Sequence, residues 1–285
     1  MPRGTPPRTV VYYQTTTVQL DDLVAYIDEQ PIKQSPITHL IIGCFHLRTN
    51  GYLHLNDYTP DNEHFNHIWP NMKALQERGV KVMAMIGGAA QGSFQVLDAE
   101  ASFEECYNTL STMLSDYNFN GIDLDIEETM SQAGASRLIN RLTVDFGPDF
   151  EISMAPVGTA LQGGVDGFSG MNYYDLEQEH GEQISFYNVQ LYNGFGTMAT
   201  TQDYEAIVDA GFHPSRVVAG VLTNEANGGD FVDLETVGRT VRALRAKYPD
   251  FGGVMGWEYF NSVSGGEERP YEWSVEISKY LNWMQ

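Results

Sequence analysis

Cysteine, positive charge and long apolar runs are all scarce in this sequence. Cys44 and Cys106 are its two cysteines, so we expect free structural thiols and no disulfide framework. Lys and Arg number 16 against 38 Asp and Glu, for a formal net charge of −22. Such a chain would be repelled by nucleic acid and by anionic membrane surfaces, so neither is an expected partner. Since no run of 18 apolar residues occurs, no transmembrane helix is expected.

The N-terminal stretch MPRGTPPRTVVYYQ contains two arginines but no apolar segment of the kind that a signal peptide needs. The sequence as it stands therefore predicts a cytoplasmic protein, or a secreted one whose signal has been removed. Apolar residues make up 42% of the chain and aromatic residues 12%. This composition is enough for a sizeable core and is not that of a disordered chain.

Apolar, β-branched runs alternate with amphipathic stretches along the whole sequence. The predicted strands span 9–13, 39–47, 80–88, 121–127, 150–157, 186–193, 216–222 and 252–260. The predicted helices lie near 20–30, 62–78, 100–117, 131–145, 173–183, 201–211, 233–247 and 271–283. Near-continuous apolar strands joined by helices indicate a parallel sheet. Eight strand–helix pairs predict an α/β fold, a (β/α)8 TIM barrel forming a single domain over 1–285 without an α+β insertion. An open, doubly wound sheet is the alternative.

The stretch NFNGIDLDIEE, residues 118–128, places carboxylates at alternate positions of a predicted strand. Asp123, Asp125 and Glu127 therefore share one face, with about 7 Å between alternate residues. We expect them to point into the barrel, with Glu127 at the carboxyl end of the strand, where barrel enzymes keep their chemistry. Carboxylates this close should titrate as a coupled set and retain a proton, as a general acid requires.

Two other interpretations of these carboxylates remain open at this point. They could lie on the solvated face of an edge strand, although the central place of this strand in the eight-fold pattern favours the barrel interior. They could also bind a hard cation. Collinear strand residues converge poorly on one ion, and the seven histidines show no ligand spacing. We therefore expect neither a metal nor a cofactor.

The segment FNGIDLDIE, residues 119–127, resembles the Asp-X-X-Asp-X-Asp-X-Glu signature of glycoside hydrolase family 18, with Asn120 where the family usually has Asp. The resemblance implies a retaining, substrate-assisted mechanism. Glu127 would protonate the glycosidic oxygen and then act as base, while the 2-acetamido oxygen of the substrate attacks. Asp125 would orient the acetamide, and Asp123 would lie beneath Asp125 and set its charge.

Other strand ends extend this resemblance. VQLYNGFG, residues 189–196, carries Gln190 and Tyr192 on one face, like the Gln-X-Tyr pair of the family's endo-β-N-acetylglucosaminidases. Tyr192 is therefore a fourth catalytic candidate, which would hold the acetamide carbonyl. The same stretch also matches a dinucleotide-binding pattern, but no acidic residue for a ribose ends the next strand.

Two further strand ends carry the resemblance. Trp257 in GGVMGWEYFNS matches the family's tryptophan beneath the scissile sugar. MIGGAAQGSF, residues 85–94, resembles the Ser-X-Gly-Gly motif, with Met85 in place of Ser. The substrate-binding candidates are Gln190, Asn193, Trp257, Tyr12, Phe45, Gly88 and Met154.

The resemblance is strongest to the fungal endo-β-N-acetylglucosaminidases of this family. It implies hydrolysis of the GlcNAc-β-1,4-GlcNAc core of N-glycans, high-mannose ones above all, on glycoproteins or free oligosaccharides. We expect the protein to act as a monomer. A chitinase with the same chemistry is the first alternative. A chitinase-like lectin that binds without cutting is the second, although such proteins often lose the acid and Glu127 is present.

Overall fold

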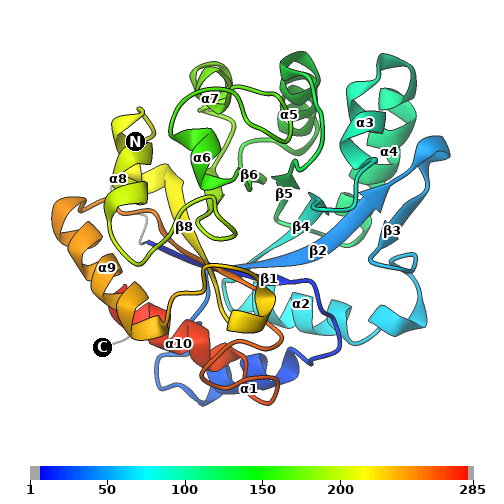
Figure 1. Ribbon diagram of the computed structural model, residues 1–285. Coiled ribbons are helices and arrows are strands. Elements are labelled where there is room, and N and C mark those ends of the chain that lie inside the picture. The colour runs from blue at the N-terminus through cyan, green and yellow to red at the C-terminus, as the bar shows by residue number, and fades with distance from the viewer. Residues whose placement is uncertain (1–6, 282–285) are drawn as a thin grey trace.

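The strands close into a barrel, as Figure 1 shows. The structure is a computed structural model that describes residues 7–281. Strand order is β1-β9-β8-β7-β6-β5-β4-β2-β3, and a further β1–β2 pairing closes the ring. Every pairing is parallel except β2–β3, so β3 lies outside a ring of eight parallel strands. The predicted (β/α)8 barrel is therefore confirmed, and the open sheet is wrong.

The strands and helices follow the alternation expected from the sequence. The strands are β1 (Arg8–Tyr13), β2 (His39–Leu47), β3 (Leu53–Leu55), β4 (Lys81–Gly87), β5 (Gly121–Asp125), β6 (Glu151–Met154), β7 (Phe186–Gln190), β8 (Val217–Leu222) and β9 (Gly253–Trp257). The helices are α1 (Asp21–Glu29), α2 (Ile68–Glu77), α3 (Ser93–Asp98), α4 (Glu100–Asp116), α5 (Gln132–Phe146), α6 (Gly158–Leu161), α7 (Tyr173–His180), α8 (Gln202–Asp209), α9 (Leu234–Lys247) and α10 (Tyr271–Tyr280).

Some predicted segments differ from these bounds. β3, α3 and α6 were not predicted, and β5 ends at Asp125, two residues before the end of the expected strand. The end of the last predicted helix, with Trp283, and the first six residues of the N-terminal stretch lie outside the described residues. Among residues 7–281 no helix has both the length and the apolar character needed to cross a membrane.

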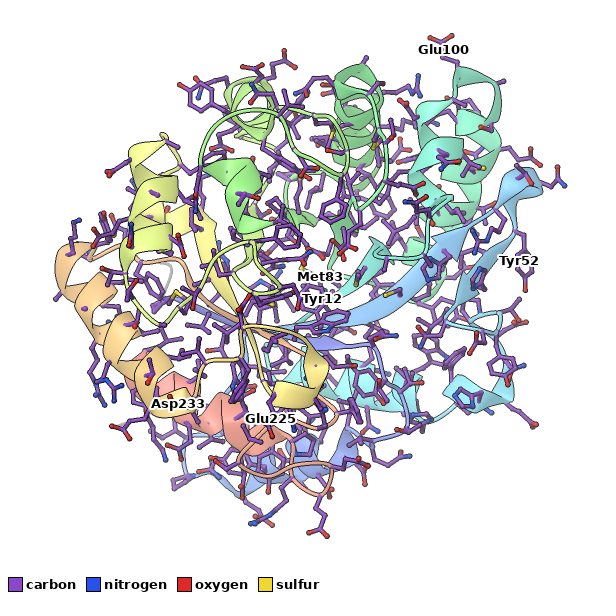
Figure 2. All side chains as sticks on the ribbon, in the orientation of Figure 1. Tyr12, Tyr52, Met83, Glu100, Glu225 and Asp233 are labelled. Carbon is purple, nitrogen blue, oxygen red and sulfur yellow. The ribbon has the colours of Figure 1, made fainter. Side chains whose placement is uncertain are left out.

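Side-chain alternation divides the barrel core into two layers. On β5, Ile122 and Leu124 face outward and pack in the large cluster between strands and helices, with Ile126 just beyond the strand. A smaller cluster fills the barrel itself and includes Tyr12, Met83 and Met255. Figure 2 shows Tyr12 and Met83 near the centre of the ring. Since outward positions take the apolar residues of β5, its carboxylates are left to face the interior.

Local sequence fixes where several helices begin. The side chains of Ser131, Asn172 and Asp233 accept hydrogen bonds from backbone N–H groups in the first turns of α5, α7 and α9. Such caps satisfy donors that the helix leaves unpaired at its N-terminus. Each of these helices follows a strand by a loop at the carboxyl end of the barrel, so the caps help to fix the loops around the mouth.

Candidate active site

The carboxylates of β5 and of the residues after it lie in the barrel interior, as predicted. Asp123 is fully buried with 0% exposure, Asp125 is buried, and Glu127 is partly exposed. The three therefore run from the core of the barrel to its open end. Asn120, where the resemblance leads one to expect Asp, lies below them. Its side-chain oxygen accepts hydrogen bonds from the backbone N–H of Val82 at 2.9 Å and from Gln76 at 3.0 Å.

Asp123 is held by hydrogen bonds from three other strands. Its Oδ2 accepts from the hydroxyl of Tyr12 on β1 at 2.7 Å. Its Oδ1 accepts from Ser153 Oγ on β6 at 2.5 Å and from Asn188 Nδ2 on β7 at 3.1 Å. Burial raises the pKa of Asp123, while these hydrogen bonds favour the carboxylate and oppose the rise. This network therefore fixes the base of the row and can keep a negative charge below Asp125.

The amide of Gln190 joins the upper two carboxylates. Its Nε2 donates to Asp125 Oδ1 at 3.2 Å, to Glu127 Oε1 at 3.3 Å and to the backbone oxygen of Ala155 at 2.9 Å. Because its own position is fixed by Ala155, Gln190 holds the two acidic side chains at one place. This amide thus positions Asp125 and Glu127 relative to each other.

Burial and the repulsion between like charges disfavour full ionisation of Asp125 and Glu127. Burial raises the pKa of Asp125 well above its usual range, and the neighbouring Glu127 and then Asp123 raise it further. Burial also raises the pKa of Glu127, with Gln190 opposing this and Asp166 adding to it. Asp125 and Glu127 titrate as one system. The pair can therefore keep a proton at a pH where an isolated carboxyl group has lost it, and this is what a general acid needs.

A cavity of about 350 Å³ opens above these groups at the carboxyl ends of the strands. Asp125, Glu127, Tyr192, Trp257 and Tyr12 all line it. The rings of Trp257 and Tyr12 meet with centroids 5.4 Å apart and planes at 57°. Flat aromatic faces beside acidic groups suit a ligand that is apolar on its faces and polar at its edges, as a sugar is.

The hydroxyl of Tyr192 has no hydrogen-bond partner among residues 7–281. Burial, followed by the charge of Asp125, raises the pKa of Tyr192 well above its ordinary value. The phenol therefore stays protonated and can donate a hydrogen bond into the cavity that its ring lines. Donation to a carbonyl oxygen of a ligand, the role that the resemblance implies for Tyr192, needs a phenol of this kind and stays a prediction.

Gly88 and Asn193 also lie on the cavity wall. A Cβ on Gly88 would come within 3.6 Å of Asp125 Oδ2 and 3.1 Å of Met85 Cε, and Gly88 has a φ of +81°. Glycine at this position therefore leaves room beside Asp125. The side-chain oxygen of Asn193 accepts from Gly229 N at 2.6 Å, which ties the loop after β7 to the loop after β8.

Phe45 and Met154 were predicted to touch substrate, and the structure places both on the far side of their strands. Each is fully buried in the cluster between strands and helices, where Phe45 packs against Phe119 at 5.8 Å. On β6, Ser153 faces inward, so its neighbour Met154 faces outward. For these two residues the prediction is wrong.

An irregularity in β2 explains the orientation of Phe45. The β2–β4 register shifts between Ile42 and Phe45. Below the shift Ile41 faces the barrel interior, and above it Cys44 does, three positions later. A bulge of this kind reverses the alternation of side chains. Cys44 and His46 therefore line the cavity in place of Phe45.

Sequence reasoning missed Ser153, Asn188 and His46. Ser153 and Asn188 are fully buried and bind Asp123. They supply polar support at the base of the carboxylate row, where Met85 stands in place of the serine of the Ser-X-Gly-Gly motif. Asn188 lies two residues before Gln190, so the same alternation that paired Gln190 with Tyr192 could have identified it. His46 could not be found this way, because the bulge in β2 is not visible in the sequence.

Known proteins resemble this chain in sequence and in fold. The family model described as glycosyl hydrolases family 18 matches residues 8–223. A solved fungal endo-β-N-acetylglucosaminidase of that family is 43% identical, with a TM-score of 0.89 over 96% of this chain and 98% of that one. Chitinase ChiC from Aspergillus fumigatus is 42% identical, with a TM-score of 0.84 over 96% of this chain and 99% of that one.

Curated relatives are more distant and are named as chitinases. Endochitinase 37 from Trichoderma harzianum is 25% identical over 72% of this chain and 65% of its own length. Chitinase D from Niallia circulans is 27% identical over 48% of this chain and 29% of its own length. The chain thus matches less than two thirds of the length of these two relatives.

Proposed function

This chain belongs to glycosyl hydrolases family 18, and we propose that it is an endo-β-N-acetylglucosaminidase acting on the GlcNAc-β-1,4-GlcNAc core of N-glycans, above all high-mannose ones. The observation that carries the proposal is the arrangement of Asp125, Glu127 and Tyr192 around one cavity, with Gln190 bridging the two carboxyl groups. Similarity to the fungal endo-β-N-acetylglucosaminidase over nearly the whole chain supports this choice of substrate. We propose further that the barrel is a single catalytic domain.

In the proposed first step, the acetamide oxygen of the bound sugar attacks its own C1. The C1–O bond to the next sugar breaks as Glu127 gives its proton to the leaving oxygen. The product of this step is an oxazolinium ion. Asp125 accepts a hydrogen bond from the acetamide N–H, and Tyr192 donates one to the acetamide oxygen until it attacks. Protein groups that hold a reacting group in place lower the barrier by positioning.

In the second step, Glu127 acts as base. It takes a proton from water, the hydroxide that forms attacks C1, and the ring of the oxazolinium ion opens to restore the acetamide. Two displacements at C1 retain its configuration. A positive charge forms on the oxazolinium ion and then disappears. The charge of Asp123, below Asp125, and the position of the proton that Asp125 and Glu127 share change with it. The indole ring of Trp257 would stack against the apolar face of the sugar.

Mass spectrometry of a high-mannose glycoprotein after incubation with the protein tests this proposal. We expect the polypeptide to keep a single HexNAc and the rest of the glycan to be released. A chitin oligosaccharide is incubated in parallel, because the similarity to chitinase ChiC favours chitin cleavage as the second candidate. Cleavage of the chitin oligosaccharide alone would overturn the N-glycan proposal and keep the chemistry. Cleavage of neither would overturn both and leave binding without hydrolysis.

Substitution Glu127→Gln tests the acid. Gln keeps the size of the side chain but cannot give up a proton, so hydrolysis should fall by at least about 10³-fold. The far-ultraviolet circular dichroism spectrum should not change. The matched control is Glu100→Gln, an exposed residue at the outer end of α4, which Figure 2 labels at the edge of the molecule. Turnover by Glu127→Gln close to that of the control would remove Glu127 from the mechanism.

A further inference from the structure

The β2–β3 hairpin has two chemically different faces. One face is apolar and belongs to the cluster between strands and helices, with Phe45, Leu47, Leu53 and Leu55. The opposite face is polar and aromatic. It carries three cross-strand rows, namely Cys44 with Asn56, His46 with His54, and Arg48 with Tyr52. Because Cys44 and His46 line the active-site cavity, this second face is a continuation of the cavity wall.

Three rings on that face lead away from the cavity. His46 and His54 have ring centroids 5.1 Å apart with planes at 36°. His54 and Tyr52 follow at 5.7 Å and 32°. Tyr52 directly precedes β3 and is 51% exposed, and Figure 2 shows it at the outer side of the molecule. We call these residues, His46, His54 and Tyr52, the ring stripe. It connects the buried cavity to an exposed aromatic side chain.

The inner end of the ring stripe has hydrogen-bonding capacity that the protein does not use. The Nδ1 atom of His46 is buried and has no partner within the part of the chain that the structure describes. Burial lowers the pKa of His46 to about 4, with His54 and Arg48 adding to the effect. The ring is therefore neutral near pH 7 and offers one donor and one acceptor. A buried polar group without a partner is uncommon and calls for a ligand or a water.

The other side of this path is the loop after β4, to which the hairpin is hydrogen-bonded. Ala89 and Ala90, which follow β4, line the cavity and are exposed. Arg48 Nη1 donates to the backbone oxygen of Gln91 at 2.8 Å, which connects the hairpin to this loop. The guanidinium is thereby engaged with a neutral oxygen. The surface leading out of the cavity is thus made of rings, small side chains, neutral hydrogen-bonding groups and the guanidinium of Arg48, which keeps its positive charge.

We propose that the ring stripe binds the sugars next to the one at the cleavage point, on the side that is released. Aromatic faces and neutral donors suit an uncharged oligosaccharide. The choice of side rests on the proposed function. In that reaction the polypeptide keeps one GlcNAc, so the released part is the one that has several sugars to bind. The ring stripe would make the enzyme favour glycans with a full mannose arm over the bare core.

Binding to the Glu127→Gln protein, which holds substrate without turnover, tests the ring stripe. His54→Ala and Tyr52→Ala are each introduced into this background, and calorimetry measures Kd for a free high-mannose oligosaccharide and for diacetylchitobiose. Loss of one stacking ring should weaken the long ligand about fivefold to tenfold and the disaccharide less than about twofold. The matched control is Tyr58→Ala. Tyr58 is also half-exposed near the hairpin, but its ring lies against His64 and Phe65.

The outcomes separate this inference from the proposed function. Equal affinity of the variants and the parent for long ligands overturns the ring stripe, whatever the enzyme cuts. So does an equal loss on both ligands, or the same loss in Tyr58→Ala. If the wild-type protein cuts chitin oligosaccharides and spares glycoproteins, the same variants are titrated with chitin oligosaccharides of two to six sugars. A loss that appears only with the longer ones then supports the ring stripe although the N-glycan proposal has failed.

Discussion

The catalytic role proposed for Asp125 has a cost in stability. It is buried beside two other acidic side chains, and burial together with Glu127 raises its pKa above the unfolded value of 3.8. The folded protein therefore binds more protons than the unfolded chain as pH rises through the interval above 3.8. Stability falls over that interval, because the slope of unfolding free energy with pH follows the difference in bound protons.

The variant Asp125→Asn should be more stable than the wild type at pH 8. The amide can still accept from Gln190, and it removes a buried charge. The gain should be on the order of 1 kcal/mol at pH 8 and smaller at pH 4, where the wild-type group keeps its proton in the folded state and is already partly protonated in the unfolded chain. Urea unfolding at the two pH values measures it. A gain at pH 4 equal to that at pH 8 would show that charge is not the cause.

The same variant tests the orienting role of Asp125. Asp125→Asn should slow hydrolysis of the intact glycan by about 10²-fold, because the acetamide must be oriented for attack in that step. Opening of a preformed oxazoline should slow less, because the attack has already happened. Rates with the two substrates are compared in one preparation. If both fall by the same factor, Asp125 does not act on the acetamide.

At the scale of elements, the loop after β4 depends on a neighbouring side chain. Glu128 is buried, and its Oε2 and Oε1 accept from the backbone N–H groups of Gly92 at 2.7 Å and Phe94 at 2.8 Å. The carboxylate thereby anchors the start of α3, and with it the loop that carries Gly88, next to Asp125. One side chain thus ties the segment that follows β5 to the segment that follows β4.

Replacement Glu128→Ala should lower the free energy of unfolding by about 2 kcal/mol, since two hydrogen bonds to a charged acceptor are lost. KM should rise because the cavity wall loosens, while the proton transfer that sets kcat should change less. Denaturant unfolding and steady-state kinetics give the two values. Glu128→Gln is the conservative comparison and should recover part of the stability. A variant with unchanged stability would show that the loop is held by other contacts.

The positions of the long strands and helices were easier to predict than short strands and local irregularities. Strand positions came from apolar runs such as 39–47, which match β2 residue for residue. The short β3 was missed because three residues, LHL, give too little pattern. The bulge in β2 was missed because it depends on pairing with β4, which is 34 residues or more away in sequence. Phe45 was misplaced for that reason, whereas the contiguous pattern around Asp123 was enough to place the β5 carboxylates.

At the scale of the whole molecule, net charge should select among glycans. The formal charge of −22 produces a negative potential around a cavity that already contains acidic groups. An anionic glycan would meet repulsion both on approach and on binding. Neutral high-mannose chains meet neither. For the proposed substrates, the charge balance would therefore act as a filter in addition to the shape of the cavity.

A phosphorylated high-mannose glycan should be cut about tenfold more slowly than the same glycan after phosphatase treatment, at low ionic strength. In 0.5 M salt the ratio should shrink towards one, because the Debye length falls to a few ångströms. The quantity to measure is kcat/KM for the two glycans at both salt concentrations. A ratio that salt does not change would point to a steric cause in the loops around the cavity.

The closure of the barrel has a consequence for its biosynthesis. β1 pairs with β2 on one side and with β9 on the other, so Val10 contacts the strand that contains Met255. A ribosome makes β1 first and β9 last. Until β9 has left the exit tunnel, β1 and β8 each have an unpaired edge, and such edges can pair with another chain. Until then the strands already made can form an open sheet at most, and this is the stage at which a chaperone that covers exposed strand edges would act.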